Sequence, residues 1–510
     1  MKIVYPRDAW RLLYPVRVLL VGLLASEVVA AWIVWSSNHE LYRKLSAIGS
    51  SGYGPLPGTN VDPSLLSLEA AWAGGLFFTL SIGAGVALLT FGAVMLVRSL
   101  PLDSQKPVKW IMLLVWGVVL VWGNAGGICP GLSAFLVLIP PVVIVAAIKG
   151  VAQRSGAHPL AWRRTLHAGL IGLLLLLWLP RINGDVFVNI KDNLLLTSRP
   201  GLKTVDLYYR YTLYPAEVFK SLFQKQITAH ALVGGGAASI ASQVNRALMN
   251  MNSFPVPDSA YADFLVQKKG DVNLVLMKGD KTVQAVTAGE LTSNPGQVML
   301  QYSAKTDDAA NFRKVTILSL LGVAPLVLYL GTFLLFCMVP GIFMPLRIST
   351  IVVPVLCCIV WSAAIVCLDT PSSAGLDRQK AAAALTDGSR KEKIAALRYI
   401  HHHKLEITRF PGYQQLLNSP DFAQRYWMVK CLGNTHHPLA MQWIIHLMQS
   451  ESPYIVCKAI EAGAGHKSPA NSRRFTRALV DILESSENWY VQYYAYRVAR
   501  EYGWIPVKSG

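Results

Sequence analysis

The chain of 510 residues is poor in charged side chains, and acidic ones are the scarcer kind. Asp, Glu, Lys and Arg make up 15% of the residues against 53% hydrophobic ones, and 47 Lys and Arg outnumber 29 Asp and Glu. Soluble globular domains usually carry about 25% charged residues. The composition therefore excludes a soluble globule and favours a membrane protein with soluble parts. The basic excess is spread along the chain, which suits loops at a membrane better than a nucleic-acid-binding surface.

The sequence also lacks the cysteine and histidine spacings that bind metals or haem. Its seven cysteines include no Cys-x-x-Cys pair, which excludes a zinc ribbon and a c-type haem attachment site. Histidines such as His401, His436 and His466 gather near the C-terminal end, but none has the His-x-x-x-His spacing of a zinc site. No nucleophile–base pair or nucleotide-binding motif stands out. We therefore expect no metal, no catalytic residue, no cofactor and no enzyme activity.

Long apolar runs are what the sequence has in abundance. The first 180 residues are interpreted as a membrane domain with five spans, at residues 18–35, 70–97, 110–122, 134–148 and 165–180. The fifth run is short and lies between Arg164 and Arg181, so it can cross only if both arginines extend toward the headgroups. Two further runs in residues 314–368 predict a transmembrane hairpin. The fold class is thus a polytopic α-helical membrane protein with about seven spans.

The hairpin decides where the polar parts lie. A pair of spans returns the chain to the side from which it came, so residues 181–313 and 369–510 must face the same compartment. The residues before the first span include Lys2, Arg7 and Arg11, and the loops assigned to the inner side are richer in basic residues. Seven spans therefore predict a bacterial inner-membrane protein with a cytoplasmic N-terminus and both polar parts in the periplasm. If the fifth run does not cross, both parts move together into the cytoplasm.

The two polar parts differ in character. Residues 181–313 predict a small α/β domain that ends in an antiparallel sheet. Its expected elements are helices at 216–224 and 237–251 and strands at 185–190, 262–267, 273–277, 282–287 and 298–303. Residues 36–68, rich in Gly, Ser and Pro, predict an irregular external loop.

Residues 369–510 are helical and repetitive. Four similar segments begin at Lys391, Gln424, Ile455 and Val491, which are 33, 31 and 36 residues apart. A helical hairpin repeated at this period is typical of an α-solenoid. The small and apolar residues at matching places resemble the short HEAT-like repeats of the phycobilisome-lyase type. That resemblance implies a protein-binding surface and no particular chemistry.

Glu27 is the one carboxylate within an apolar run. An ionisable group inside a bilayer is costly and suggests a function, such as relaying protons or binding an ion. A hydrogen-bonded Glu that faces its own helix bundle is the alternative. The irregular segment Gly123–Gly131, followed by Pro140 and Pro141, has the look of a broken transporter helix, although a tight turn and ordinary kinks fit it equally.

Two aromatic patches are candidates for binding a partner. The first comprises Tyr208, Tyr209 and Arg210, which a half-buried strand would also explain. The second comprises Trp489, Tyr490, Tyr493 and Tyr494, for which covering the exposed face of the last repeat is the alternative role.

Three functions remain open from the sequence. The leading interpretation is an inner-membrane scaffold or anchoring subunit that presents both polar parts to other membrane or periplasmic proteins of an envelope complex. The second is a transporter or ion-coupled protein that uses Glu27 and the broken helices. The third is a membrane-anchor subunit of a respiratory or electron-transfer complex. The expected partners are proteins and the lipid bilayer, and not nucleic acid.

Overall fold

The computed structural model divides into two compact units between which the chain alternates. It describes residues 14–54, 56, 66–100, 102–152, 161–213, 217–234, 238–269, 273–338, 346–368, 375–450, 452–466 and 469–502. The apolar unit comprises Met1–Ser36, Leu68–Phe187 and Asp307–Leu368, and the polar unit comprises Ser37–Ser67, Val188–Thr306 and Asp369–Gly510. The α/β part and the repetitive helical part thus belong to one compact unit.

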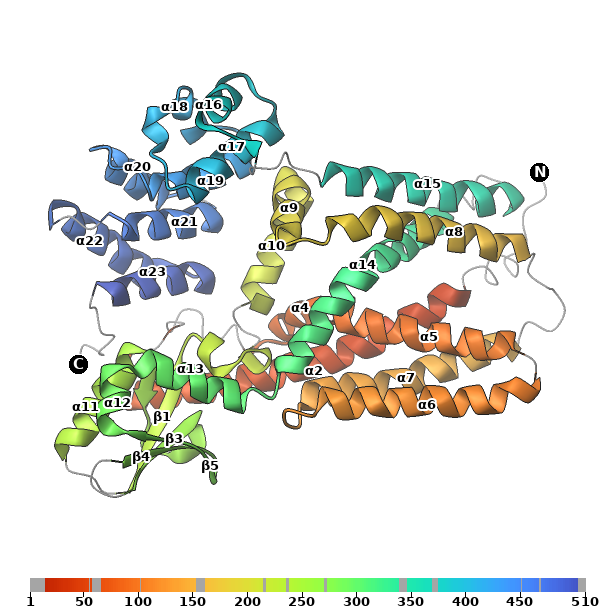
Figure 1. The fold of residues 1–510 in the computed structure, drawn as a ribbon, viewed down its shortest axis with the longest axis horizontal. Coiled ribbons are helices and arrows are strands. Elements are labelled where there is room, and N and C mark those ends of the chain that lie inside the picture. The colour runs from red at the N-terminus through yellow and green to blue at the C-terminus, as the bar shows by residue number, and fades with distance from the viewer. Residues whose placement is uncertain are drawn as a thin grey trace. The chain divides into compact units, whose positions relative to one another are not determined.

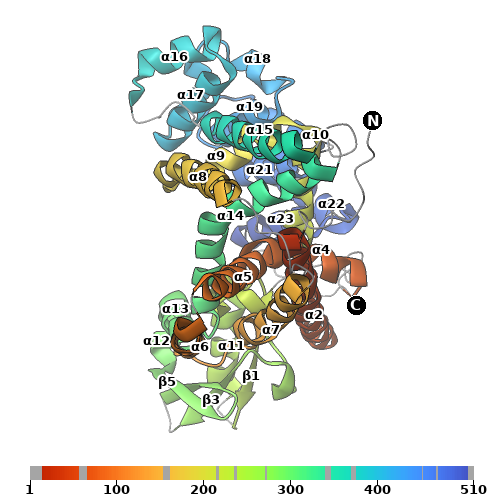
Figure 2. The same ribbon diagram turned by 90° about the vertical axis from the view of Figure 1, so that its right-hand side faces the viewer.

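The apolar unit is a bundle of long helices (Figure 1). Its elements are α2 (Tyr14–Ser50, up to Ser36), α4 (Leu68–Phe78), a π-helical turn η1 (Thr79–Gly83), α5 (Ala84–Ser99), α6 (Leu102–Gly123), α7 (Pro130–Ala152), α8 (Ala161–Trp178), α14 (Ala310–Met338) and α15 (Leu346–Cys367). Helix α15 packs against α8 and α14 (Figure 2). Small residues allow close approach, because a Cβ at Gly22 would lie 2.9 Å from Ala87 Cβ and from Val143 Cγ2.

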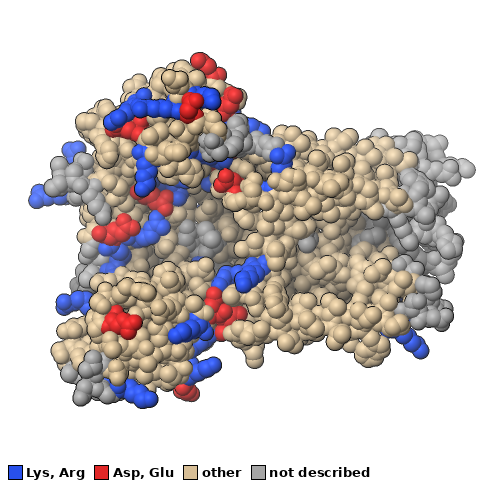
Figure 3. Space-filling model, viewed as in Figure 1, with Lys and Arg blue, Asp and Glu red and all other residues tan. Residues whose placement is uncertain are grey.

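The described helices of the apolar unit agree with a multi-pass membrane protein and provide four to six candidate spans, where about seven were expected. Four described helices are long and apolar enough to cross a membrane: Val16–Ser50, Leu68–Arg98, Gln105–Gly123 and Pro130–Ile148. Two bent pairs, Thr165–Arg181 with Val186–Thr197 and Ala310–Gly322 with Pro325–Phe333, raise the number to six if each is one span. The expected turn of the last hairpin lies largely outside the described residues. The face of this unit seen in Figure 3 carries few charged side chains, as lipid contact requires.

Helix α2 extends beyond the apolar run at residues 18–35 from which it was predicted. It continues through Ser50, so that the first half of the expected loop at 36–68 is helical, and residues 57–65 lie outside the described part. The reason is an apolar stripe at helical spacing, Leu41, Leu45 and Ile48, whose side chains are at most 3% exposed. This second half of α2 belongs to the polar unit.

The polar unit contains a small mixed sheet. Its strands lie in the order β2-β1-β3-β4-β5 (Ser253–Pro255, Thr228–Val233, Phe264–Lys269, Asn273–Lys278 and Lys281–Thr287). The β1 strand pairs in parallel with β2 and β3, whereas β3, β4 and β5 pair antiparallel. Helix α11 (Ala238–Asn250) connects β1 to β2, and α12 (Ala288–Ser293) and α13 (Pro295–Thr306) follow the sheet. The helix expected at 237–251 and the three strands expected between 262 and 287 are confirmed.

Two expected strands are helices instead. Residues 185–190 fall in α9 (Val186–Asn193), and 298–303 fall in α13. In α13 the buried residues Val298, Met299, Tyr302 and Ser303 recur at helical spacing, and Pro295 starts the helix. The expected helix at 216–224 is reduced to two single 3-10 turns, η5 (Glu217–Phe219) and η6 (Leu222–Gln224).

The C-terminal part of the polar unit is a succession of helices (Figures 1 and 2). Four inner helices, α17 (Arg390–His402), α19 (Phe422–Leu432), α21 (Pro453–Ala464) and α23 (Trp489–Glu501), pack one against the next. Outer helices α16 (Arg378–Asp387), α18 (Tyr413–Leu417), α20 (Ala440–Leu447) and α22 (Pro469–Ser485) each contact the inner helix that follows them in number. Side chains of Ser389, Asp421 and Asn488 cap three of the inner helices, which explains where these helices begin.

Candidate functional site: the inner face of the helical ladder

The inner helices bind a segment of the same chain. This segment, residues 188–213, contains most of α9, the 3-10 turn η3 (Leu195–Thr197), α10 (Arg199–Tyr208) and the π-helical turn η4 (Tyr209–Leu213). Leu196 and Val205 from it are buried in one hydrophobic core with residues of all four inner helices. The inner face of the ladder is therefore partly filled by the chain itself.

Asp192 is the polar centre of this packing. Its side chain is fully buried, and Oδ2 accepts hydrogen bonds from Arg398 Nη2 at 2.5 Å and from Trp427 Nε1 at 2.6 Å. Arg398 Nη1 also donates to Asn189 Oδ1 at 2.8 Å, and Arg390 Nη2 donates to the Asp192 carbonyl at 3.0 Å. A buried carboxylate is tolerated because an arginine and an indole N–H replace its hydration. These contacts fix α9 on α17 and α19.

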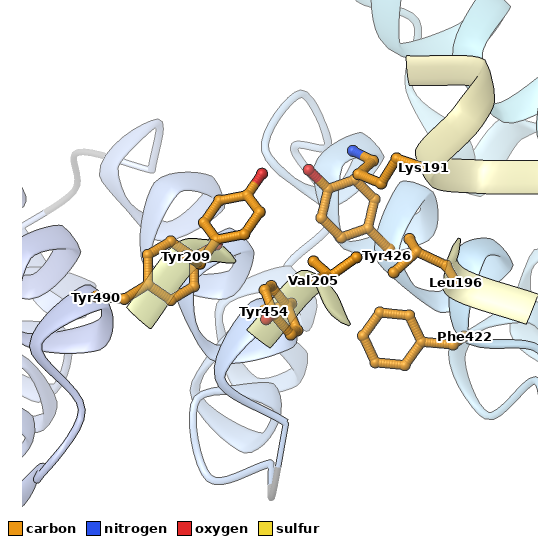
Figure 4. A pocket seen from close by; sticks show the side chains of 8 residues that line it. All are labelled: Lys191, Leu196, Val205, Tyr209, Phe422, Tyr426, Tyr454 and Tyr490. Carbon is orange, nitrogen blue, oxygen red and sulfur yellow. The ribbon is translucent and has the colours of Figure 1, made fainter. Parts of the chain in front are cut away.

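Tyrosines close the other end of the contact. The Tyr209 ring lies 5.0 Å from the Tyr490 ring and 5.5 Å from the Tyr454 ring, centre to centre. Lys191, Phe422, Tyr426 and these tyrosines line a cavity of about 10 Å³, which has room for about one water molecule (Figure 4). Burial raises the pKa of Tyr209 to about 12, with a smaller contribution from Tyr208, so this hydroxyl stays protonated at neutral pH.

The two aromatic patches expected to bind partners are thus brought together. Trp489 and Tyr490 are 5% and 3% exposed, so these two side chains lie inside the protein. Tyr208, Tyr209, Tyr493 and Tyr494 are half-buried, and Arg210 is exposed and 3.5 Å from Asp206. The strand interpretation of the first patch is wrong, since Leu207–Leu213 is helical. Binding of a partner by the remaining side chains stays a prediction.

A cluster of cations surrounds three aromatic rings on the same inner face. We call it the cation cluster: Lys191, Arg398, Lys430, Lys458 and Arg497. The ammonium groups of Lys191 and Lys458 lie 4.2 and 5.9 Å from the centre of the Tyr426 ring. Lys430 and Arg398 lie 3.8 and 5.4 Å from the Trp427 ring. Lys458 and Arg497 lie 5.1 and 4.9 Å from the Tyr494 ring. Because the Tyr426 and Trp427 rings are 6.0 Å apart, these cations form one group.

Two carboxylates balance only part of this charge. Asp192 pairs with Arg398 and lies 3.7 Å from Lys191, and Glu461 pairs with Lys458 and, at 2.7 Å, with Arg497. Lys430 forms no ion pair with any described residue. Burial lowers the pKa of Lys430 to about 8, helped by Lys458 and Lys191. The group therefore carries more positive charge than its own acids compensate.

Sequence reasoning missed the cation cluster, although a signal exists. The ninth residue of every inner helix is charged: Arg398, Lys430, Glu461 and Arg497. Residues at the same position of successive repeats lie above one another in a stack of helices. Aligning the segments by their N-caps would have found this row. Lys191 and Asp192 come from a distant segment and carry no such signal.

A second charged network ties the polar end of α2 to the sheet. The Asp263 carboxylate accepts hydrogen bonds from Lys225 Nζ at 2.8 Å, from Lys44 Nζ at 2.9 Å and from the Ala229 N–H at 2.9 Å. Glu217 lies 3.7 Å from Lys44. Burial alone would raise the pKa of Asp263, but Lys225 and Lys44 outweigh it and hold that pKa well below its usual range. We call these four side chains the balanced network.

Three hydrogen-bonded side chains, Ser253, His230 and Asn245, are connected like a catalytic triad, but a substrate cannot reach them. His230 Nδ1 lies 3.0 Å from Ser253 Oγ, and His230 Nε2 lies 2.9 Å from Asn245 Oδ1. His230 is 0% and Ser253 2% exposed, so no substrate reaches the hydroxyl. Burial lowers the pKa of His230 to about 4, which keeps the ring neutral. The group satisfies buried polar atoms between β1, β2 and α11.

Glu27 lies inside the apolar unit, close to the Thr79 side chain. It is 6% exposed, and neither carboxylate oxygen has a hydrogen-bond partner among the described residues. The Thr79 hydroxyl, in the π-helical turn η1, is likewise without a partner in the described part of the chain. A Cβ at Gly75 would lie 2.9 Å from Glu27 Oε1, so glycine is needed to admit this carboxyl.

The irregular segment Gly123–Gly131 is a tight turn, which is the alternative that the sequence left open beside a broken helix. Helix α7 runs from Pro130 to Ala152 through both Pro140 and Pro141. The turn before it is held by Asn124 Oδ1, which accepts from the Cys129 N–H at 2.8 Å and from Ser133 Oγ at 3.2 Å. The irregular stretch is therefore a side-chain-stabilised turn between two continuous helices.

No other constellation of chemical interest appears in the described residues. Among them, no group of three or more His, Cys, Asp or Glu side chains could hold a metal ion. The buried Cys431 and Cys457 contact the Leu397 and Tyr490 carbonyls as small core residues. No family model, curated protein or solved structure matches this chain.

Proposed function

We propose that the chain is a membrane-anchored scaffold whose polar unit, a small α/β domain joined to a short HEAT-like α-solenoid, binds other proteins of a cell envelope. The observation that carries the proposal is the way the polar unit is assembled. Three stretches of chain, each separated from the next by apolar helices, combine into one compact body. Repeated attachment to membrane helices suits a platform held at a bilayer better than a freely moving catalyst.

Contacts inside the polar unit support a single platform. Tyr496 Oη and Arg500 Nε, both from α23, donate hydrogen bonds to Asn252 Oδ1, each at 3.2 Å. Asn252 adopts a φ of 58°, a left-handed conformation that asparagine tolerates. Two parts that share such contacts must lie on the same side of a membrane. This agrees with the hairpin expected at residues 314–368.

The proposed location is the periplasmic side of a bacterial inner membrane, because the basic loops favour a cytoplasmic N-terminus. Impermeant maleimide on intact cells tests it. Lys281→Cys on the sheet and Gln415→Cys on the helical part place thiols at exposed positions, with Cys367→Ser as background. We expect both sites to react. Reaction at one alone contradicts the common side, and protection of both moves the polar unit to the cytoplasm.

Scaffolding itself is tested by crosslinking in living cells. A photoreactive phenylalanine at Tyr493, half-buried on the last inner helix, is compared with one at Tyr261, which is 41% exposed beside the sheet. We expect discrete protein adducts from Tyr493 and none from Tyr261. Equal smears from both positions, or adducts from neither, would count against a partner on the last repeat.

A second candidate is an ion-coupled membrane protein, and Glu27 is the observation that favours it. A carboxyl buried between helices with no partner in the described structure is costly to keep without a use. Flux of protons or sodium into liposomes containing the purified protein tests this function. We expect Glu27→Gln to abolish a flux that Glu69→Gln, at the exposed start of α4, leaves unchanged.

A further inference from the structure

The cation cluster has more charge than its surroundings neutralise. Its five basic side chains face two carboxylates, which leaves three positive charges in excess. Burial is partial: the side chains of Lys458 and Lys191 are 12% and 20% exposed, and that of Arg398 is 9% exposed. Like charges in this partly buried position repel one another more strongly than in bulk water, because the surrounding protein is less polarisable. A compensating anion would therefore be bound favourably.

The Lys430 ammonium and the Tyr426 hydroxyl are donors that form no hydrogen bond or ion pair with the described residues. The Lys430 ammonium lies over the Trp427 ring and has no ion pair or hydrogen bond with a described residue, and an aromatic face replaces an anion incompletely. Tyr426 is 8% exposed, and its hydroxyl has no hydrogen-bond partner among the described residues. In Figure 4 the Lys191 side chain, which lines the cavity, lies alongside the Tyr426 ring. The Lys430 ammonium and the Tyr426 hydroxyl thus lie within the cation cluster without an acceptor among the described residues.

We propose that the cation cluster is a binding site for a phosphate group, held chiefly by Lys191, Lys430 and Lys458 with the Tyr426 hydroxyl. A phosphate offers several acceptor oxygens and up to two negative charges, which matches a cluster whose basic donors outnumber its carboxylate acceptors, Asp192 and Glu461. A single carboxylate would leave more of the excess charge uncompensated. The cavity beside Tyr426 has room for about one water, so the phosphate binds at the partly exposed edge of the cluster.

Titration calorimetry of the full-length protein in detergent with inorganic phosphate tests the site, at constant ionic strength set with chloride. We expect saturable binding by the wild type and by the matched control Lys281→Gln, whose lysine is exposed on β5. Lys430→Gln should weaken binding at least about tenfold, the loss of one charge-assisted contact. Thermal unfolding without phosphate verifies that each variant is folded. Equal affinity of Lys430→Gln and wild type, or heat that does not saturate, overturns the proposal.

The phosphate can be free or can belong to a lipid headgroup, and nanodiscs separate the two sources. The protein is placed in phosphatidylcholine discs or in discs containing phosphatidic acid, and inorganic phosphate is then added. Heat of binding in both discs assigns the site to free phosphate. Heat in phosphatidylcholine alone assigns it to the lipid headgroup, which already fills the site in the other disc. Absence of binding in both overturns the proposal.

Discussion

The polar unit contains two buried charged networks that differ in their balance. In the balanced network, Lys44 and Lys225 face Glu217 and Asp263, and the paired side chains of Lys44 and Asp263 are both 5% exposed. The cation cluster is more open and has five cations against two acids. One network is closed within the fold, whereas the other leaves charge without a partner.

This difference indicates how to separate structure from function among buried charges. A charge is retained in a protein interior at low cost only when a partner and hydrogen bonds replace water. The balanced network meets that condition with its own side chains. Its role is therefore structural: it connects α2 to the sheet. The cation cluster does not meet the condition, and it is there that a ligand is needed.

The largest effect is expected from breaking the balanced network. Asp263→Asn leaves Lys44 and Lys225 buried without a full counter-charge and should lower the free energy of unfolding by about 3–5 kcal/mol. Thermal unfolding of the full-length protein in detergent measures this, with the exposed Asp280→Asn as control. Adding Lys44→Met to Asp263→Asn should restore part of the loss. If the double variant is no more stable than the single one, the network is not a coupled unit.

Next in size is a loss of stability in acid. The pKa of His230 is lowered by burial to about 4 from 6.5, so between pH 6.5 and 4 the unfolded chain binds a proton that the folded chain does not. Stability is therefore full above pH 6.5 and falls by about 3 kcal/mol as the pH drops to 4. Unfolding midpoints across this range measure the slope. His230→Gln should flatten it and the exposed His402→Gln should not, although His401, with a pKa of about 4, retains a share.

The fold could be predicted from the sequence where a pattern was long or repeated. Long apolar runs marked the membrane helices, and strands such as Asn273–Lys278 between turn residues were found. Short apolar runs were not reliable: 185–190 and 298–303 fit a strand and a helix about equally, and packing decided for helices. The end of α2 was missed because Gly, Ser and Pro further along outweighed the stripe of Leu41, Leu45 and Ile48.

The site was harder to foresee than the fold. Asp192 and Arg398 are 206 residues apart in the sequence, and nothing local announces that they meet. The tyrosines were predicted to be binding candidates, but the sequence could not show that Tyr209 packs against both Tyr454 and Tyr490. Only the charged residue at the ninth position of each inner helix could have been predicted from the sequence. Pairings across a fold depend on tertiary packing, which a linear pattern does not contain.

A smaller effect, of opposite sign, should come from the cation cluster. Without phosphate, Lys430→Gln removes a charge that burial, Lys458 and Lys191 disfavour, so it should stabilise the protein at pH 7 by the order of 1 kcal/mol. The gain should shrink as the pH rises from 8 to 10.5, because folded Lys430 loses its proton before the unfolded chain does. The nearby carboxylates of Glu461 and Asp192 favour the charged form of Lys430 and oppose the effect. Unfolding temperatures of both proteins in chloride buffer measure it, and destabilisation by Lys430→Gln would show that the cluster is already balanced.

The smallest effect on stability is expected at Arg210, whose exposed ion pair is the reference for the two buried networks. Its ion pair with Asp206 is 3.5 Å long and joins side chains that are 50% and 39% exposed. Exposed pairs of this kind contribute about 0–1 kcal/mol, so Arg210→Ala should leave the unfolding temperature nearly unchanged. The same variant is informative for partner binding, since the first aromatic patch ends at this residue. If Arg210→Ala reduces crosslinking from Tyr493 while stability is unchanged, the guanidinium contacts the partner. If neither changes, the partner surface is confined to the last repeats and the segment 188–213 serves only to fill the inner face.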